Sequence, residues 1–283
     1  MTVATTSTML AAIFAGSGCA DLREAQAPIA VRSIAAACNM RVDTLLVLLP
    51  GAYDKPDDFI KQGFVDAVRE RGIAADIALV DATVSYYRDG NGKRGGSGEP
   101  SIVARLDADV IAPARARGMR HVWIAGISIG GLGSLIYAES RRGVVDGLLL
   151  IAPYLGERSI AAEVAASGGL ARWSPPGAIP ADDDDRRLWQ WLQTLTRQLT
   201  RPPMRPPSAE TVVRPPVVFL GYGTDDRFAA SHHLLAAALP DNHVFTATGG
   251  HDWPAWRAVW PQLLDAAPFP RDASCARSKP SPQ

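Results

Sequence analysis

The sequence lacks the features that would assign it to several common classes of protein. Its 29 basic and 29 acidic residues leave no net charge, whereas a nucleic-acid-binding protein would need a basic face. It has three cysteines and no Cys/His cluster at metal-ligand spacing, so a structural zinc site is not expected. It contains no internal repeat. With 283 residues and 47% hydrophobic content, the chain can bury one sizeable core, or a core with a small cap.

The first 27 residues are predicted to form a leader. Met9 to Gly16 is an apolar run too short to span a bilayer, but it suits the apolar part of an export signal. Small residues before Cys19 resemble the processing site of bacterial lipoproteins, so we expect export, with Cys19 as a candidate for lipidation and membrane attachment. Two features depart from that pattern: Gly16 replaces a leucine-like residue, and no basic residue precedes Arg23. The alternative is an alanine-rich leader without a targeting role in a cytoplasmic protein.

The two remaining cysteines flank the predicted core. A disulfide between Cys38 and Cys275 would tie the two ends of the chain together and close a very long loop. The alternative is two unrelated thiols, because sequence does not give their distance.

Residues 40–268 alternate between apolar runs typical of strands and segments with helical periodicity. This alternation predicts an α/β fold, in which a doubly wound, mostly parallel sheet is connected by right-handed crossovers. Arg88 to Pro100, rich in glycine and charge, is predicted to be a flexible surface loop. The expected strands are Thr44–Leu49, Ile73–Val80, His121–Ala125, Val144–Ala152, Val217–Gly221 and Val244–Ala247. The expected helices are Asp57–Arg71, Ile102–Arg117, Ser128–Arg142, Arg186–Leu199 and Trp253–Asp265.

One stretch, about 154–210, interrupts the alternation and is predicted to be a small helical cap insertion. The acidic run Asp182 to Asp185 precedes its amphipathic helix, where negative charge favours a helix N-terminus; an acidic binding site is the alternative. If the cap covers a site, its tryptophans would favour an apolar or aromatic acyl group, although each could equally be a core residue. These are Trp173, Trp189 and Trp191, with Trp253 and Trp256 further along the chain. Residues 269–283 are predicted to be a C-terminal tail.

The clearest motif is the GxSxG sequence from Gly126 to Gly130, which stands between an apolar strand and a helix. In this context the motif predicts a nucleophile elbow, in which Ser128 is exposed on a sharp, strained turn. Side chains two positions before and after the serine would collide in such a turn, so glycine is required at both. The alternative is an ordinary glycine-rich turn.

A serine nucleophile needs a base, and His251 is the best placed of five histidines. It follows the last predicted strand and therefore lies at the carboxyl edge of the sheet, as Ser128 does. The acid that orients the imidazole should follow the fifth predicted strand, and we favour Asp226, with Asp225 as the alternative and the other of the two serving as a helix cap. His232 and His233 are interpreted as solvent-facing or structural.

The reaction also needs backbone N–H donors for the oxyanion. The N–H of Ile129 follows the nucleophile directly, and the turn after the first predicted strand, Pro50-Gly51-Ala52-Tyr53, offers a second donor at Ala52. Tyr53 could instead donate, or line the substrate pocket with Trp253; the alternative is that this turn is only a connector.

The order Ser128, Asp226, His251, together with the elbow and the early glycine turn, resembles the α/β-hydrolase superfamily over about Thr44 to Asp265. This resemblance implies hydrolysis of an ester, thioester or amide without a metal or organic cofactor. Pro50-Gly51 departs from the His-Gly common at that turn. We expect a carboxylic-ester hydrolase that acts on a small-molecule ester through an acyl-enzyme, with no nucleic-acid partner. The alternatives are an amide or thioester hydrolase, or a non-catalytic surface lipoprotein that uses the fold as a binding scaffold.

Overall fold

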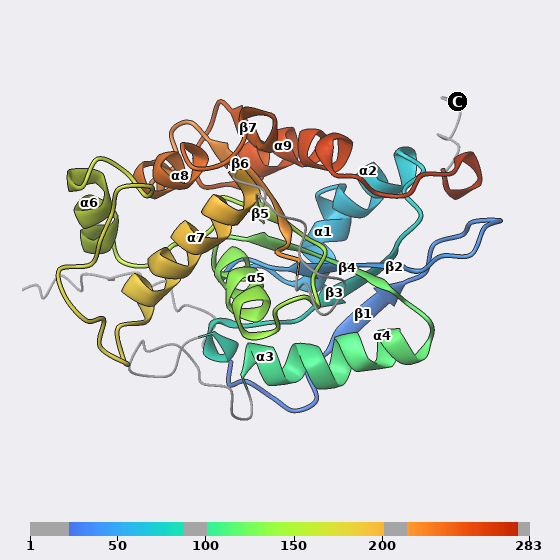
Figure 1. Ribbon diagram of the computed structural model, residues 1–283. Coiled ribbons are helices and arrows are strands. Elements are labelled where there is room, and N and C mark those ends of the chain that lie inside the picture. The colour runs from blue at the N-terminus through green and yellow to red at the C-terminus, as the bar shows by residue number, and fades with distance from the viewer. Residues whose placement is uncertain (1–22, 88–100, 201–213, 277–283) are drawn as a thin grey trace, which may run out of the picture.

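A computed structural model describes residues 23–87, 101–200 and 214–276, which form a seven-stranded sheet with helices on both faces (Figure 1). The strand order is β1-β3-β2-β4-β5-β6-β7, and every neighbouring pair is parallel except β1 and β3. This is the predicted doubly wound, mostly parallel architecture. The strands are β1 Val31–Ile34, β2 Thr44–Leu49, β3 Asp76–Val80, β4 His121–Ile127, β5 Gly147–Ile151, β6 Val217–Gly223 and β7 Val244–Ala247.

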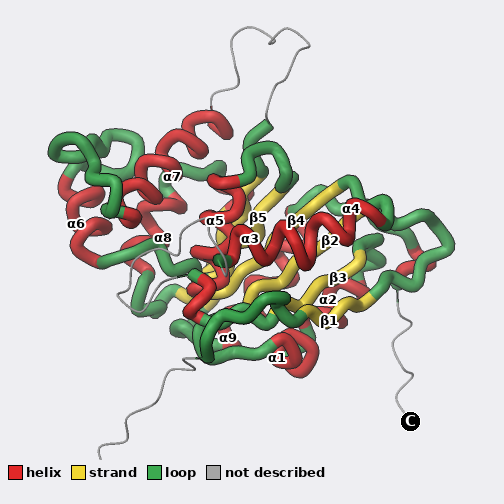
Figure 2. Tube along the Cα trace, turned by 90° about the horizontal axis from the view of Figure 1, so that it is seen from below, coloured by secondary structure: helices red, strands yellow, loops and turns green. Residues whose placement is uncertain are grey.

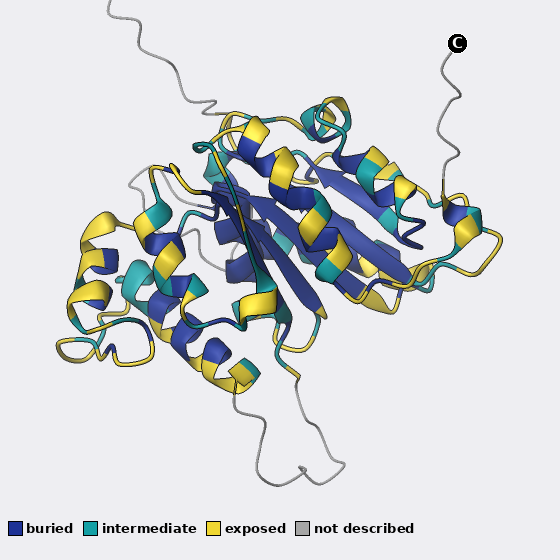
Figure 3. Cartoon of the chain, turned by 90° about the horizontal axis from the view of Figure 1, so that it is seen from above, coloured by how far each residue is buried: buried dark blue, intermediate teal, exposed yellow. Residues whose placement is uncertain are grey.

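The helices form two layers around this sheet. In the views from the front and from below, α1, α2 and α9 lie on one face and α3, α4 and α5 on the other (Figures 1 and 2). Both faces of the central strands are therefore covered, and β2 and β5 are buried along their whole length (Figure 3), as parallel strands usually are. The helices are α1 Pro56–Lys61, α2 Phe64–Glu70, α3 Ile102–Arg105, α4 Ala112–Ala116, α5 Ile129–Ser140, α6 Arg158–Ala166, α7 Asp184–Thr200, α8 Ala229–Ala236 and α9 Trp253–Ala266.

Two predicted helices are less regular than expected. The helix predicted over 57–71 is divided into α1 and α2 at Gly63, whose φ of 78° lies in the left-handed region that glycine adopts without strain. The helix predicted over 102–117 has a π-helical segment, Leu106–Ile111, between α3 and α4. Hydrophobic periodicity, which is similar on both sides of such breaks, does not reveal them.

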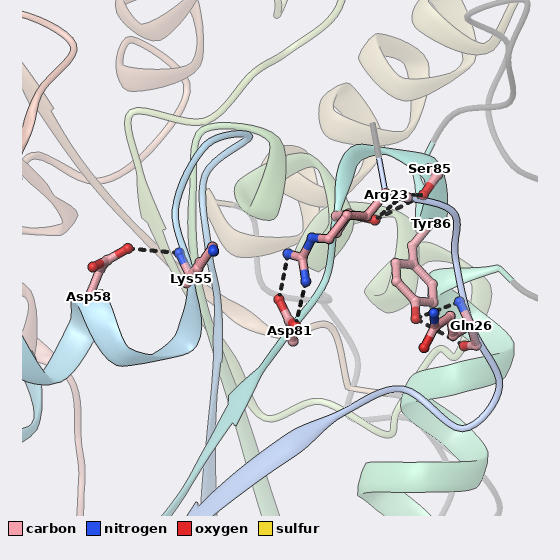
Figure 4. A network of polar contacts seen from close by, with 8 residues as sticks. Arg23, Gln26, Lys55, Asp58, Asp81, Ser85 and Tyr86 are labelled. Atoms are coloured by element: carbon pink, nitrogen blue, oxygen red, sulfur yellow. Dashed lines mark hydrogen bonds and ion pairs between the residues drawn. The ribbon is translucent and has the colours of Figure 1, made fainter. Parts of the chain in front are cut away.

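The domain extends further towards the N-terminus than predicted. The structure places β1 at the edge of the sheet, antiparallel to β3, although the domain was expected to begin at residue 40. Within the predicted leader, Arg23 donates two hydrogen bonds to Asp81, and Ser85 donates one to the Arg23 carbonyl (Figure 4). Gln26 and Tyr86 are joined by a reciprocal pair of bonds. Residues 23–27 are thus attached to the domain, whereas Cys19 lies outside the described residues.

The predicted C-terminal tail also packs on the domain, up to the end of the described chain at residue 276. Phe269 is buried against Trp123, with ring centroids 4.7 Å apart, and Ala74 N–H donates to the Pro270 carbonyl. Cys275 forms a disulfide with Cys38, 237 positions away in the sequence. The predicted pairing of these two cysteines is therefore confirmed. The loop predicted over 88–100 lies outside the described residues.

Between β5 and β6, where a cap is predicted, the described chain contains α6 and α7. The C-terminal half of α7 lies beside Ala138 of α5 and Pro215 before β6, because residues from all three line one cavity of about 150 Å³. This part of α7 therefore covers the side of the domain, not the carboxyl edge of the sheet. Trp173, Trp189 and Trp191 are buried in the hydrophobic core. They give no support to an aromatic acyl preference.

Among the residues that the structure describes, no helix is long and apolar enough to cross a bilayer.

Candidate active site

Ser128 stands at the turn where β4 ends and α5 begins. Its φ of 53° is unusual for a residue with a side chain and marks a strained backbone. The turn is held by backbone bonds on both sides: Ser128 N–H donates to the Ile151 carbonyl at 2.9 Å, and its carbonyl accepts from Tyr154 N–H at 2.9 Å. The strain is therefore balanced by fixed contacts to the end of β5 and to the segment that follows it.

The two glycines of the motif are required by close packing. A Cβ on Gly126 would lie 2.3 Å from the Gly130 carbonyl oxygen. A Cβ on Gly130 would lie 2.3 Å from the carbonyl oxygen of Leu49 and 2.6 Å from that of Pro50. The nucleophile turn is thus pressed directly against the turn after β2.

Three of the predicted site residues form a chain of hydrogen bonds. His251 Nε2 lies 2.9 Å from Ser128 Oγ, and His251 Nδ1 lies 2.7 Å from Asp226 Oδ2. An ionised carboxylate only accepts, so Nδ1 carries a proton and Nε2 is free to accept from the serine hydroxyl. Both side chains of the His–Asp pair are shielded, at 9% and 0% exposure.

The aspartate in this chain is Asp226, whose second carboxylate oxygen accepts from Phe228 N–H at 2.8 Å. Burial alone would raise the pKa of Asp226, but the hydrogen bonds from His251 and Phe228 outweigh it and lower the pKa below its usual range. The carboxylate therefore stays ionised. Asp225 is exposed: its carboxylate accepts from the neighbouring Thr224 hydroxyl at 3.4 Å, and its backbone N–H donates to the Gly249 carbonyl. It does not cap α8, whose N-cap position is Phe228.

The predicted oxyanion donors lie on the two turns that are pressed together. Within the described chain, the N–H groups of Ala52 and Ile129 have no hydrogen-bond acceptor, although Ile129 is buried and Ala52 half-buried. Free N–H groups on a turn beside the nucleophile and at the first position of the following helix are the donors that acyl transfer needs. Tyr53, on the same turn as Ala52, is exposed at 68%.

A second histidine supports the nucleophile turn from behind. His232 was expected to be solvent-facing or structural; it is fully buried, and its Nε2–H donates to the Pro153 carbonyl at 2.9 Å. Pro153 packs against Gly131 of the elbow. Burial lowers the pKa of His232 to about 4, so the ring is neutral at pH 7. The other three histidines, His121, His233 and His243, make no hydrogen bond or ring contact with Ser128, Asp226 or His251 in the described part of the chain.

Aromatic side chains surround the imidazole of His251. Phe228 and Trp256 meet it edge-to-face, with ring centroids 5.1 and 5.3 Å away, and Trp256 contacts Trp253. Trp253 donates its indole N–H to Asp54 at 3.1 Å. No sequence motif singles out Asp54 or His232. Asp54 is an acid in a predicted connector, and His232 is one of two adjacent histidines on a predicted helix.

No group of three or more His, Cys, Asp or Glu residues in the described part of the chain is arranged to hold a metal ion.

Solved structures share this arrangement of strands and helices. S-formylglutathione hydrolase from Staphylococcus aureus aligns with a TM-score of 0.53 at 11% identity, over 84% of this chain and 91% of its own. Serine hydrolase F of the same organism, described as fluorophosphonate-binding, aligns at 0.52 and 12% identity, over 84% and 98%. A ferulic acid esterase aligns at 0.50 and 14% identity, also over 84% and 98%. No family model and no curated protein matches the sequence. The structural likeness shows that the chain has the α/β-hydrolase fold.

Proposed function

We propose that the protein is a serine hydrolase that cleaves carboxylic esters. The observation that carries this proposal is the unbroken hydrogen-bond chain from Ser128 through His251 to Asp226, on a strained turn at the carboxyl edge of the sheet. A binding scaffold would need neither the strained serine nor a buried carboxylate hydrogen-bonded to a histidine. The solved structures of similar fold that are named as an esterase and as hydrolases support the same reaction class.

In the proposed reaction, His251 Nε2 takes the proton of Ser128 as its oxygen attacks the ester carbonyl. The ionised Asp226 holds Nδ1–H and stabilises the imidazolium that forms. The N–H groups of Ala52 and Ile129 donate to the oxyanion of the tetrahedral intermediate. His251 then gives its proton to the leaving alcohol, and the cycle repeats with water to release the acid from Ser128.

Labelling with a fluorophosphonate probe tests this function. The wild type should label at a single site and should hydrolyse p-nitrophenyl esters, whereas Ser128→Ala should do neither and His251→Ala should label very slowly. A wild type that neither labels nor hydrolyses would contradict the proposal and favour a scaffold. Substrate panels then separate ester from amide and thioester hydrolysis, because the S-formylglutathione hydrolase of similar fold makes the thioester alternative worth testing.

We also propose that the protein is exported and that Cys19 is lipidated. The Cys38–Cys275 disulfide supports export, since disulfides persist in oxidising compartments. Fractionation of cells that express the wild type and Cys19→Ser tests both points. Export with lipidation predicts a membrane fraction that Cys19→Ser loses to the soluble exported fraction; a cytoplasmic wild type would contradict export.

A further inference from the structure

Asp54 occupies the inner side of the turn that follows β2. Its N–H donates to the Gly51 carbonyl at 3.2 Å, and its carboxylate lies against the backbone of Gly51. A Cβ on Gly51 would lie only 2.5 Å from Asp54 Oδ2 and 3.7 Å from a methyl group of Ile127. The carboxylate therefore fills the space inside the turn, and Ala52 is enclosed between two residues that bond to each other.

The same carboxylate reaches the helix that begins after His251. Asp54 Oδ1 accepts from the indole N–H of Trp253, which is the first residue of α9. The Trp253 ring is fixed on its other sides by edge-to-face contacts with Phe64 at 5.4 Å and Trp256 at 5.2 Å. Trp256 in turn contacts the imidazole of His251 at 5.3 Å. A continuous set of contacts thus joins the turn after β2 to the proposed base.

Other charged groups near Asp54 are already engaged. Asp58 accepts from Lys55 N–H at 2.8 Å (Figure 4), and it pairs with Lys61 at 3.1 Å. His251 is bound to Asp226. Burial raises the pKa of Asp54, and the repulsion from Asp58 adds to this effect, while the bonds from Trp253 and Gly51 oppose it. Burying a carboxyl group beside another acid costs free energy. Asp54 nevertheless occupies this position, where it contacts both the turn after β2 and the first residue of α9.

We propose that Asp54 is a positioning residue: by binding both Gly51 and Trp253, it fixes the oxyanion turn relative to the start of α9, the helix that directly follows the segment with the base. This inference rests on the proposed function, because it takes the Ala52 N–H as an oxyanion donor. A donor or base displaced by about 1 Å can reduce the rate of an enzyme about a hundredfold without touching the substrate. Asp54 therefore acts through Ala52 and Trp253.

The test compares kcat, KM and melting temperature for Asp54→Ala, Asp54→Asn, Trp253→Phe and the double variant Asp54→Ala/Trp253→Phe. Asp57→Asn is the matched control, since Asp57 is an exposed acid three positions away that pairs with Arg32. Trp253→Phe keeps an aromatic ring but removes the indole N–H together with the five-membered ring that carries it, and Asp54→Asn keeps a carbonyl oxygen that can accept from the indole N–H.

We expect Asp54→Ala to lower kcat about a hundredfold with KM nearly unchanged, because the lost groups act on the transition state. Trp253→Phe should lower kcat about tenfold, and the double variant should be no slower than Asp54→Ala, since both changes remove one shared bond. Asp54→Asn should recover part of the lost kcat, and Asp57→Asn should match the wild type.

Two results would overturn the inference: wild-type kcat in Asp54→Ala, or losses that multiply in the double variant. If Asp54→Ala does not fold, Asp54→Asn and Trp253→Phe decide: the inference then requires a lower kcat in Trp253→Phe at an unchanged melting temperature, and wild-type kcat there contradicts it. Failure of the proposed function gives a different pattern, in which the wild type is as inactive as Ser128→Ala.

Discussion

A His–Asp pair lies at the carboxyl edge of the sheet and another at its amino edge, and the two pairs differ in the distance between their side chains and in their exposure to water. At the carboxyl edge, His251 and Asp226 are 2.7 Å apart and almost completely shielded. At the amino edge, His121 and Asp146 are 3.4 Å apart, and their side chains are 53% and 42% exposed. Water screens the interaction between His121 and Asp146, so this pair contributes little to the stability of the protein. The same two residue types therefore meet the requirements of the proposed catalytic pair only at the edge where burial and a third partner hold them in place.

The amino edge is not featureless. An open groove of about 890 Å³ runs along it, lined by His121, Asp146, Arg142, Arg214 and other residues. No serine or cysteine belongs to its described lining, whereas the carboxyl edge presents Ser128 on a strained turn. We therefore expect changes at the carboxyl edge to affect activity and changes at the amino edge to affect stability at most.

The largest expected difference is between the two histidines. His251→Ala should lower kcat on the order of a millionfold, because the serine loses its base. His121→Ala should leave kcat within about twofold, as exposed substitutions away from a site do. Ester hydrolysis by the two purified variants measures this, and comparable losses in both would refute the contrast between the edges.

Replacing the aspartate of each pair should give the same contrast between the two edges, with a smaller loss of kcat. Asp226→Asn should lower kcat about 10⁴-fold, because the amide favours the wrong imidazole tautomer, while Asp146→Asn should retain wild-type kcat. Circular dichroism of both variants serves as a folding control. A fully active Asp226→Asn would show that another residue, with Asp225 the first to examine, orients the base.

The amino edge should respond in stability instead. The disulfide lies at this amino edge. Arg271 forms an isolated antiparallel β-bridge with Ile73, which stands just before the start of β3, and Cys275 follows Arg271 by four residues. Replacing both Cys38 and Cys275 by serine should lower the free energy of unfolding by about 2–5 kcal/mol and leave kcat unchanged at a temperature where the variant is folded. Urea unfolding followed by activity assays tests both parts. A large loss of kcat in the folded variant would contradict the division between the edges.

The last expected effect is a loss of stability at acidic pH that comes from the buried His232. The pKa of His232 is about 4 in the folded protein and about 6.5 in an unfolded chain. The unfolded state therefore binds more protons between these values, so stability falls as the pH drops from 6.5 to 4, by about 3 kcal/mol for this group. His232→Gln should lack this component in urea unfolding at pH 7 and pH 4. An equal loss of stability in the wild type and His232→Gln would show that His232 does not titrate in this way.

Much of this architecture could be predicted because its signals are local. The buried strand β2 and the short strand β7 have the predicted bounds, and the GxSxG motif identified the turn at Ser128. Pairing His251 with Ser128 needed only the rule that parallel strands end at one edge. The fold class followed from the alternation of strand-like and helical segments.

What the sequence did not reveal depends on contacts between distant segments. The strand β1, with the sequence VRSI, has no apolar run and is a strand because it pairs with β3. The buried His232 donates to the carbonyl of Pro153, 79 positions away, and the role proposed for Asp54 depends on Trp253, 199 positions away. The sequence left open whether the cap tryptophans line a substrate site or belong to the core, and their burial in the structure shows that they belong to the core.

The disulfide has a consequence for biogenesis. Cys38 and Cys275 are separated by 237 positions, and almost the whole sheet is encoded between them. The ribosome, or a translocation channel, must therefore release the chain through residue 275 before the two sulfurs can meet. Mass spectrometry of nascent chains truncated before Cys275 should accordingly find the thiol of Cys38 still reduced.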